Sequence, residues 1–159
     1  NDIAIKKIKQ NFKAGIIITS EQKNGRGQYG RKWISQKGNL LVSIFFKINK
    51  RISLKKITKI NCYILKNLLT EQIKRKITIK LPNDLLLNKK KICGILQEII
   101  FYDGCKYIII GIGINLVKNP IIKNYQITNI LSETGIKIPI LKLVKIIEKK
   151  YKNKIKQFA

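Results

Sequence analysis

Apolar residues recur at the spacing of one helix face in three stretches of the chain, residues 3–12, 54–69 and 141–155. Gly15 is expected to end the first helix, and Pro139 precedes the last one. The apolar faces are Ile5, Ile8 and Phe12 in the first stretch, Ile57, Ile60, Ile64, Leu65 and Leu68 in the second, and Val144, Ile147, Tyr151 and Ile155 in the third. The pattern therefore predicts three amphipathic helices that each turn one side to a core.

Strands are predicted where β-branched runs or alternating apolar and polar residues occur. The expected strands are residues 16–19, 39–48, 77–80, 85–87, 92–101 and 106–111, with residues 112–116 as a continuation of the last. Residues 88–91 and 102–104 are the expected turns of a meander. The predicted architecture is a single domain of 159 residues in which helices flank one mostly antiparallel sheet, an α+β fold.

The charge of the chain is strongly unbalanced, with 34 Lys and Arg against 8 Asp and Glu and a formal net charge of +26. Such an excess is typical of nucleic-acid-binding proteins. Here nearly all basic residues are Lys, and Ile, Lys and Asn, which share A/T-rich codons, are all abundant. A biased genome explains this composition without a polyanion partner. We therefore expect no specific nucleic acid, and a basic nucleic-acid-binding domain stays as an alternative without a recognition motif.

Histidine is absent from the sequence, and Cys62, Cys93 and Cys105 are widely spaced. This excludes Ser-His-Asp and Cys-His catalysis, and it disfavours a zinc site or a disulfide framework. A reducing cytoplasm suits such cysteines. Because no run of about 18 apolar residues occurs, we expect no membrane partner. The first residues do not resemble a signal peptide, and without an initiator Met we expect a trimmed or partial chain.

A polar, glycine-rich loop is predicted at residues 21–38, and it contains the segment GRGQYGRKW from Gly25 to Trp33. Long ordered loops in compact domains are usually functional. Glycine lets the backbone turn tightly and bring its N–H groups close to a ligand. Arg26 and Arg31 are two of the four arginines, and Trp33 is the sole tryptophan. Since arginine suits phosphate and carboxylate, we predict that this loop contacts an anionic ligand rather than being merely solvated.

A second cluster combines the turn KLPND at residues 80–84 with the segment KICGILQE that begins at Lys91. Asn83 and Asp84 follow a strand and a proline turn, where they can hydrogen-bond an adenine or hold Mg²⁺. Lys91 begins an otherwise apolar strand, where its charge can neutralise a carboxylate or phosphate. Gly94 allows a ligand to approach closely. Taken alone, these residues fit an ordinary proline turn and a solvated lysine tip equally well.

Residues 111–115, of sequence GIGIN, interrupt an apolar strand with two glycines and an asparagine. On its own this segment is typical of a β-bulge. The third glycine of a dinucleotide-binding fingerprint is missing.

Together and in this order, these segments resemble the biotin–protein ligase family. That family is marked by a G-R-G-R-x-G-R-x-W loop, a K-W-P-N-D turn, an R-K-x-x-G-I-L-x-E strand and a G-x-G-x-N segment, which match residues 25–33, 80–84, 90–98 and 111–115. The resemblance implies the class II synthetase-like catalytic domain of biotin and lipoate ligases. It also implies a reaction in which biotin attacks the α-phosphate of ATP and biotinyl-AMP then acylates a lysine of a biotin carboxyl carrier domain.

The resemblance also assigns roles to individual residues. The implied catalytic residues are Lys91, on the biotin carboxyl group and the α-phosphate, and Arg26. The implied biotin-binding residues are Gln22, Gly25, Arg26, Gly27, Lys91, Gly94, Ile95 and Leu96. The implied ATP- or adenylate-binding residues are Gln28, Arg31, Trp33, Asn83, Asp84 and Asn115, and Asp84 is the candidate Mg²⁺ ligand. ATP, biotin and Mg²⁺ are thus the implied cofactors, and no histidine is needed where positioning and charge neutralisation drive the reaction.

Two residues depart from the family pattern, since Gln28 replaces an arginine of the loop and Leu81 replaces the tryptophan of the K-W-P-N-D turn. Asn1 aligns with the last residue of a family Ser-Thr-Asn segment. Neither an N-terminal winged helix nor a C-terminal small β-barrel is expected within residues 1–159, so no repressor role is predicted. The resemblance is compatible with a homodimer. The nearest alternative is a lipoate–protein ligase, which shares the fold but generally carries an Arg-x-Ser-Gly-Gly-Gly loop.

Overall fold

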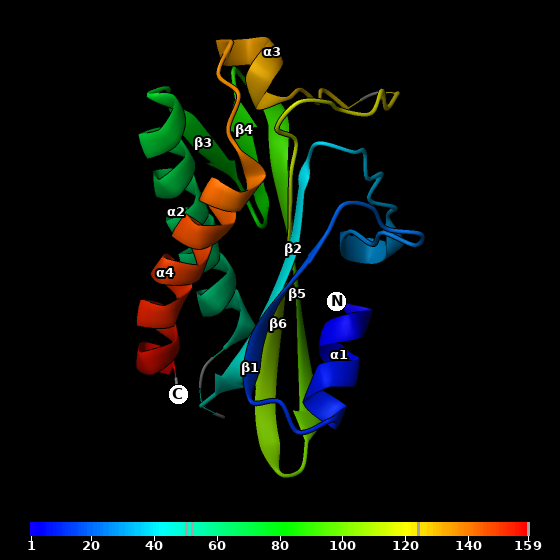
Figure 1. The fold of residues 1–159 in the computed structure, drawn as a ribbon, viewed down its shortest axis with the longest axis vertical. Coiled ribbons are helices and arrows are strands. Elements are labelled where there is room, and N and C mark those ends of the chain that lie inside the picture. The colour runs from blue at the N-terminus through cyan, green and yellow to red at the C-terminus, as the bar shows by residue number, and fades with distance from the viewer. Residues whose placement is uncertain (50, 52, 124, 159) are drawn as a thin grey trace.

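Six strands form one sheet at the centre of the molecule (Figure 1). The computed structural model describes residues 1–49, 51, 53–123 and 125–158. The strands are β1 (Ala14–Thr19), β2 (Leu40–Ile48), β3 (Ile77–Lys80), β4 (Asp84–Leu87), β5 (Lys90–Tyr102) and β6 (Cys105–Ile114), in the order β1-β2-β6-β5-β4-β3. Every neighbouring pair is antiparallel. With its flanking helices, this sheet confirms the predicted α+β architecture.

Two long helices cover one face of the sheet, and a short one covers part of the other. Helices α2 (Leu54–Ile73) and α4 (Ile140–Phe158) lie on the same face, while α1 (Asp2–Lys9) lies on the opposite face (Figure 1). The loop after β1 and the segment after β6 also lie on the α1 side. The sequence did not predict α3 (Ile130–Thr134), because its five residues are too few to show a period. None of the described helices is both long and apolar enough to span a membrane.

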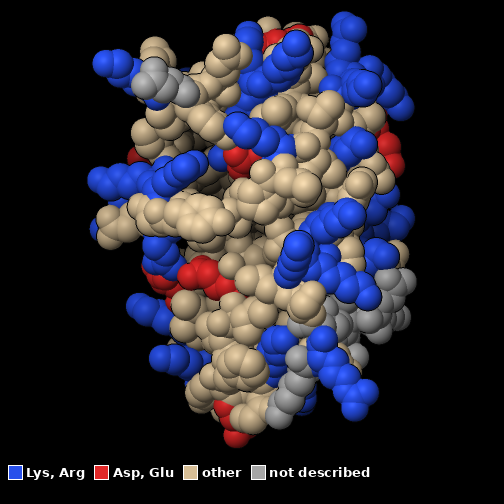
Figure 2. Space-filling view, turned by 180° about the vertical axis from the view of Figure 1, so that it is seen from behind, with Lys and Arg blue, Asp and Glu red and all other residues tan. Residues whose placement is uncertain are grey.

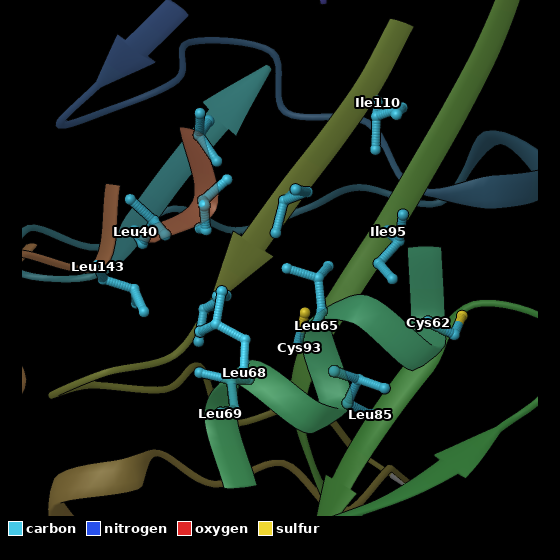
Figure 3. Packing of buried hydrophobic residues seen from close by; sticks show 14 of the residues in the cluster. Leu40, Cys62, Leu65, Leu68, Leu69, Leu85, Cys93, Ile95, Ile110 and Leu143 are labelled. Carbon is cyan, nitrogen blue, oxygen red and sulfur yellow. The ribbon is translucent and has the colours of Figure 1, made fainter. Parts of the chain in front are cut away.

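The main core fills the space between the sheet and the two long helices. Leu65, Leu68 and Leu69 of α2 pack with Ile95 and Ile110 of the sheet (Figure 3). The predicted apolar face of the last helix is confirmed, since the buried residues of α4 include Leu143, Val144, Ile147 and Tyr151. The strands alternate as expected, and β2 turns Leu40, Val42, Ile44, Phe46 and Ile48 toward this core.

The opposite face of the sheet changes character along its strands. Beside α1 it carries an apolar cluster of Ala4, Ile8, Phe45, Tyr107 and Ile109. Further along the strands, Ser43, Gly111 and Leu96 form one cross-strand row. The next row consists of Leu41, Gly113, Gly94 and Asp84. The small residues in these rows leave space above the sheet, and this space becomes the floor of the candidate site.

The end of the first helix differs from the prediction. The helix stops at Lys9, so Phe12 lies outside it and its side chain is half exposed. Gly15 belongs to β1 and lies opposite Phe45. A Cβ on Gly15 would lie 2.7 Å from the Phe45 ring, so this glycine makes room for an aromatic side chain rather than ending a helix.

The turn between β4 and β5 is tighter than predicted. It contains only Asn88 and Lys89, and both have positive φ, as a two-residue type I′ turn requires. Lys90 and Lys91 therefore belong to β5 and not to the turn. This places the backbone of Lys91 in the sheet, where its side chain has a fixed direction.

Candidate active site

One cavity of ≈ 1050 Å³ opens on the α1 side of the sheet. Sites for drug-sized ligands occupy roughly 300–1,000 Å³, so this cavity can hold a nucleotide joined to a second small molecule. The predicted site residues that line it are Gln22, Arg26, Gly27, Gln28, Arg31, Trp33, Asn83, Asp84, Lys91, Gly94, Ile95, Leu96 and Asn115. The fold thus brings all the predicted motifs to one place, and Gly25 alone of the predicted residues does not line the cavity.

The glycine-rich segment forms a short hairpin at the edge of the cavity. The N–H of Gly27 donates to the carbonyl of Arg31 (2.7 Å), and the N–H of Trp33 donates to the carbonyl of Gly25 (2.9 Å). A 3₁₀ turn, η1 (Gln28–Gly30), closes its tip. A Cβ on Gly25 would lie 2.3 Å from the carbonyl oxygen of Trp33, so the hairpin closes only with glycine there. Gly25 therefore shapes the loop without lining the cavity.

Arg26 anchors this hairpin to α1 and to β5. Its guanidinium donates to both carboxylate oxygens of Asp2, at 2.7 and 3.0 Å, and reaches Glu98 at 3.4 Å. The Glu98 carboxylate also accepts a hydrogen bond from the side-chain amide of Asn1. The hydrogen bond from Arg26 lowers the pKa of Asp2. Arg26 is thus paired with carboxylates in this structure, and its contact with a phosphate stays a prediction.

Trp33 lies against the floor of the cavity, over two glycines that face each other across β5 and β6. A Cβ added to Gly94 would lie 2.7 Å from the Trp33 indole, and one added to Gly113 would lie 2.3 Å from it. Strands β2 and β5 both pair with β6 in unbroken register through Gly111 and Gly113. The β-bulge that the GIGIN segment suggested is therefore not formed. The glycines instead make room for side chains from other segments, since Trp33 lies over Gly94 and Gly113 and the Asn1 side chain lies over Gly111. In this structure the indole, and not an open gap, occupies the space above Gly94.

Lys91, Asp84 and Tyr125 form a linked cluster in the cavity wall. The ammonium of Lys91 lies 2.8 Å from Oδ1 of Asp84, and the hydroxyl of Tyr125 donates to Oδ2 at 2.6 Å. Asp84 is only 8% exposed, so this pair is shielded from water. The ammonium also lies 5.5 Å from the centre of the Trp33 ring and 5.6 Å from that of Tyr125. Burial and the hydrogen bond to Asp84 raise the pKa of Tyr125 to about 12, so it remains a neutral donor at neutral pH.

Tyr125 is the main site residue that sequence reasoning missed. Backbone hydrogen bonds hold its segment against the start of β5, where the N–H of Lys91 donates to Gln126 and the N–H of Thr128 donates to the carbonyl of Lys91, both at 2.9 Å. The segment has no periodicity, and Tyr125 is separated from Asp84 by 41 residues in the chain. Its only sequence signal is an aromatic residue in an irregular stretch after the GIGIN segment.

Two asparagines of the motifs have different surroundings. Asn115 is 2% exposed, and its Nδ2 donates to the carbonyl of Thr128 at 3.1 Å. Its Oδ1 is buried and has no hydrogen-bond partner among the described residues, which leaves an acceptor for a ligand. Asn83 has a structural contact, since its Nδ2 donates to the carbonyl of Ile95 at 2.8 Å. The N–H of Ile95 donates back to the carbonyl of Asn83 at 3.0 Å, which fixes the turn against β5.

The remaining predicted residues divide between the floor and the rim of the cavity. Leu96 lies opposite Gly111 on the α1 side, whereas the side chain of Ile95 packs in the main core and only its edge borders the cavity. Gln22 is held by a reciprocal pair, in which its N–H donates to the hydroxyl of Ser35 (3.0 Å) and that hydroxyl donates to its carbonyl (3.3 Å). At the rim, Gln28 is partly exposed and Arg31 is exposed.

A resident metal centre does not fit this site. Among the described residues, no group of three or more Asp, Glu, Cys or His side chains is placed to hold a metal ion. Asp84 is the predicted Mg²⁺ ligand, but Lys91 and Tyr125 engage both of its oxygens. A metal ion that arrived with a nucleotide would share Asp84 with these two contacts.

Comparison with known proteins identifies relatives of this chain. A model of the biotin/lipoate A/B protein ligase family matches residues 3–115. The bifunctional ligase/repressor BirA of Escherichia coli K12 is 32% identical over 148 residues, which are 87% of this chain and 44% of BirA. The chain thus spans less than half the length of this relative.

Solved structures of similar fold include two ligases with bound ligands. The biotin protein ligase of Leishmania major in complex with biotinyl-5-AMP has a TM-score of 0.81 and 25% identity, over 99% of this chain and 71% of that one. The biotin protein ligase of Aquifex aeolicus in complex with biotin and ATP has a TM-score of 0.77 and 26% identity, over 89% of this chain and 60% of that one. A P. falciparum protein in complex with lipoate is more distant, with a TM-score of 0.59 and 16% identity, and this likeness shows the fold alone. The predicted class II synthetase-like fold is therefore confirmed.

Proposed function

This chain belongs to the biotin/lipoate A/B protein ligase family, and on that premise we propose that it activates biotin with ATP and transfers it to a lysine of a biotin carboxyl carrier domain. The observation that carries the proposal is the shielded ion pair of Lys91 with Asp84, which lies beside Trp33. The cavity around this pair is lined by residues of every motif. Similarity to ligases solved with biotinyl-5-AMP, and with biotin and ATP, supports it.

The first step of the proposed reaction is a substitution at phosphorus. A carboxylate oxygen of biotin attacks the α-phosphorus of ATP, the bond to the bridging oxygen breaks, and pyrophosphate leaves. Because a carboxylate is already deprotonated at neutral pH, this step needs no general base, which suits a chain without histidine. Negative charge builds up on the phosphoryl oxygens. We assign its neutralisation to Lys91, whose ammonium lies in a shielded wall where a charge interacts strongly.

The second step is an acyl transfer. The neutral amine of the carrier lysine attacks the acyl carbon of biotinyl-AMP, an amide bond forms, the bond from that carbon to the phosphate oxygen breaks, and AMP and one proton leave. The mixed anhydride must be kept from water until that lysine arrives. We propose that the hairpin of residues 25–33 provides this shield, because it crosses the edge of the cavity and Arg26 fastens it to Asp2 and Glu98.

We place the nucleotide at the end of the cavity that Trp33 and Asn115 line. The unpaired Oδ1 of Asn115 suits the exocyclic amino group of adenine, which is a hydrogen-bond donor. Asn83 and Asp84 complete this end of the cavity. Gln28 and Arg31 are the proposed loop contacts to the phosphates, because they lie at the rim of the cavity.

We place biotin over the glycine-lined part of the floor. Leu96 would contact the apolar part of biotin, Gln22 would meet its polar ureido edge, and Gly94 would border the ligand through the Trp33 indole that covers it. Ile95 would contribute backbone and not its core-packed side chain. In this arrangement Gly25, Arg26 and Gly27 act by shaping and anchoring the hairpin.

Mg²⁺ would enter as part of the ATP substrate. We propose Asp84 as the residue nearest to it, because Asp84 adjoins the lysine assigned to the phosphate. The protein offers no carboxylate cluster for a resident ion among its described residues. No step above is therefore assigned to a protein-bound metal.

We further propose that the described residues act as one catalytic domain whose partner is the carrier domain. Lys and Arg side chains are spread over the face drawn in Figure 2 rather than gathered in one patch. This favours diffuse, salt-sensitive attraction to nucleic acid over specific recognition. The free thiols of Cys62, Cys93 and Cys105 suit a reducing cytoplasm. A homodimer stays compatible with the family resemblance.

Calorimetry with biotin and with lipoate, each with and without ATP, tests this proposal and its nearest alternative. We expect biotin to bind and lipoate to bind at least tenfold more weakly, a difference of about 1.4 kcal/mol. Emission from Trp33, the sole tryptophan, provides a second measurement inside the cavity. Equal or tighter binding of lipoate would favour the lipoate–protein ligase, and binding of neither ligand would contradict both.

A further inference from the structure

The two carboxylate oxygens of Asp84 have different contacts, since Oδ1 forms an ion pair without an aligned hydrogen bond among the described residues, and Oδ2 accepts a hydrogen bond. Lys91 holds Oδ1 at 2.8 Å, and the hydroxyl of Tyr125 holds Oδ2 at 2.6 Å. At 8% exposure, this carboxylate cannot rely on bulk water for hydrogen bonds. Without the hydroxyl, Oδ2 would be left without a donor, and the carboxylate would turn both oxygens toward the ammonium. A lysine engaged by both oxygens presents less of its charge to a phosphate.

Contacts that do not involve the hydroxyl fix the position of the Tyr125 ring. The ammonium groups of Lys80 and Lys91 lie 4.8 and 5.6 Å from its centre. Residues 126 and 128 are hydrogen-bonded to the backbone of Lys91, so the segment and β5 hold each other in place. Cations over an aromatic face are attracted by its electrons, which favours this position of the ring. The hydroxyl is therefore held in place relative to both members of the ion pair.

From this geometry we infer that Tyr125 is a positioning residue for the adenylation step, because it occupies one oxygen of Asp84 and so keeps the ammonium of Lys91 available to the substrate. The inference rests on the proposed function, which assigns Lys91 to the phosphoryl group. Tyr125 acts through Asp84 and Lys91 and does not itself touch the reacting atoms. Its role is thus separate from that of the four motifs, none of which contains it.

The variant Tyr125→Phe removes the hydroxyl and keeps the ring beside the two lysines. Tyr102→Phe is a matched control, because it also removes one hydroxyl hydrogen bond, to the carbonyl of Lys9 at 3.0 Å, but outside the cavity. Biotin-dependent pyrophosphate release is measured for the parent and both variants over a range of biotin and ATP concentrations. We expect Tyr125→Phe to lower kcat about tenfold to a hundredfold, the scale of one hydrogen bond to a charged group, with KM for ATP changed less than about twofold. Tyr102→Phe is expected to keep the parent kcat.

A double-mutant cycle separates positioning from a general structural effect. In an Asp84→Asn background, the carboxylate that Tyr125 holds is absent, so adding Tyr125→Phe should change the rate by less than about twofold. The rates are compared in single turnovers, because Asp84→Asn is itself expected to be slow.

The outcomes distinguish the inference from the function on which it rests. An active parent with an unchanged kcat in Tyr125→Phe overturns the inference alone, and so do fully additive effects in the cycle. A higher kcat or a lower KM for ATP in Tyr125→Phe would show that the hydroxyl blocks Asp84, and would also overturn it. A folded parent that releases no pyrophosphate with biotin contradicts the proposed function itself, and the role of Tyr125 falls with it.

Discussion

Gly94 and Gly113 lie directly opposite each other on β5 and β6, and the Trp33 indole fills the space that side chains on both residues would occupy. Neither residue has a positive φ, so backbone conformation does not require glycine here. The close approach of the aromatic ring does. The pair explains how residues from three separate motifs form one surface. The indole in turn lies beside the ammonium of Lys91.

Gly113→Ala is therefore expected to push Trp33 off the sheet. A Cβ there would lie within 2.3 Å of the indole, and overlaps in packed regions cost about 1–3 kcal/mol. The melting temperature should fall, and the emission of Trp33 should shift to the red as the indole enters water. In a Trp33→Ala background the same glycine substitution should cost much less. An equal loss of stability in both backgrounds would mean that the indole is not what Gly113 accommodates.

Lys91→Ala is expected to slow biotin-dependent pyrophosphate release about a hundredfold, because one charge-assisted contact to a phosphoryl transition state is lost. The structure adds a loss of stability, since Asp84 would stay buried without its cation. In Lys91→Ala/Asp84→Asn the melting temperature should recover while the rate stays low. Recovery of both properties would show that Lys91 serves folding only, and a Lys91→Ala rate within twofold of the parent would exclude its assigned role.

Gln28→Arg is expected to make the protein retain biotinyl-AMP longer. Gln28 lies at the hairpin tip, lines the cavity and offers only a neutral amide. A hydrogen bond to a charged group contributes about 1–2 kcal/mol more than a neutral one, which corresponds to roughly five- to thirtyfold slower loss. Radiolabelled adenylate is formed on both proteins and chased with unlabelled biotin. Equal or slower loss from the parent would show that another residue, such as Lys32, already supplies the charge.

Glu133 is expected to stabilise the fold in a pH-dependent way. It accepts hydrogen bonds from Asn88 (2.7 Å), Thr128 (2.8 Å) and Lys90 (3.1 Å), and these lower its pKa below the ordinary value of 4.5. A lowered pKa means that the stabilisation is fully present above about pH 4.5 and is lost as the pH falls through the lowered value. The difference in free energy of unfolding between the parent and Glu133→Gln should therefore shrink on acidification.

Denaturant unfolding of both proteins at a series of pH values between about 6 and 3 measures this difference. Glu148→Gln is the control, because Glu148 forms an exposed i,i+4 pair with Lys152 on α4, and such pairs contribute little to stability at any pH. A difference for Glu133→Gln that stays constant over the whole range would show that its carboxylate charge does not stabilise the fold.

Local patterns in the sequence were sufficient to predict most helices and strands, because each has a period long enough to see. The strands β2 and β6 and the apolar faces of α2 and α4 appear in the structure as predicted. The end of α1 was missed because Gly15 does not end the helix. It makes room for the ring of Phe45 on the neighbouring strand. The short α3 was missed because it is only five residues long.

The site was predictable where a motif supplies its residues, and not where it depends on tertiary pairing. Lys91 and Asp84 were expected in the site, but their direct ion pair was not. Arg26 was assigned to a phosphate, and its pairing with Asp2 and Glu98 could not be foreseen, because they are 24 and 72 residues away in the chain. Tyr125 reaches the site through backbone pairing of an irregular segment, which has no sequence signature.

The most direct test of the account is biotin-dependent release of pyrophosphate from ATP by the parent protein. We predict release that needs both ATP and biotin, that lipoate does not replace, and that accompanies the formation of biotinyl-AMP on the protein. A parallel thermal unfolding measurement shows that the protein is folded. Equal release with lipoate, or no release with either compound at saturating concentrations from a folded protein, would contradict the account.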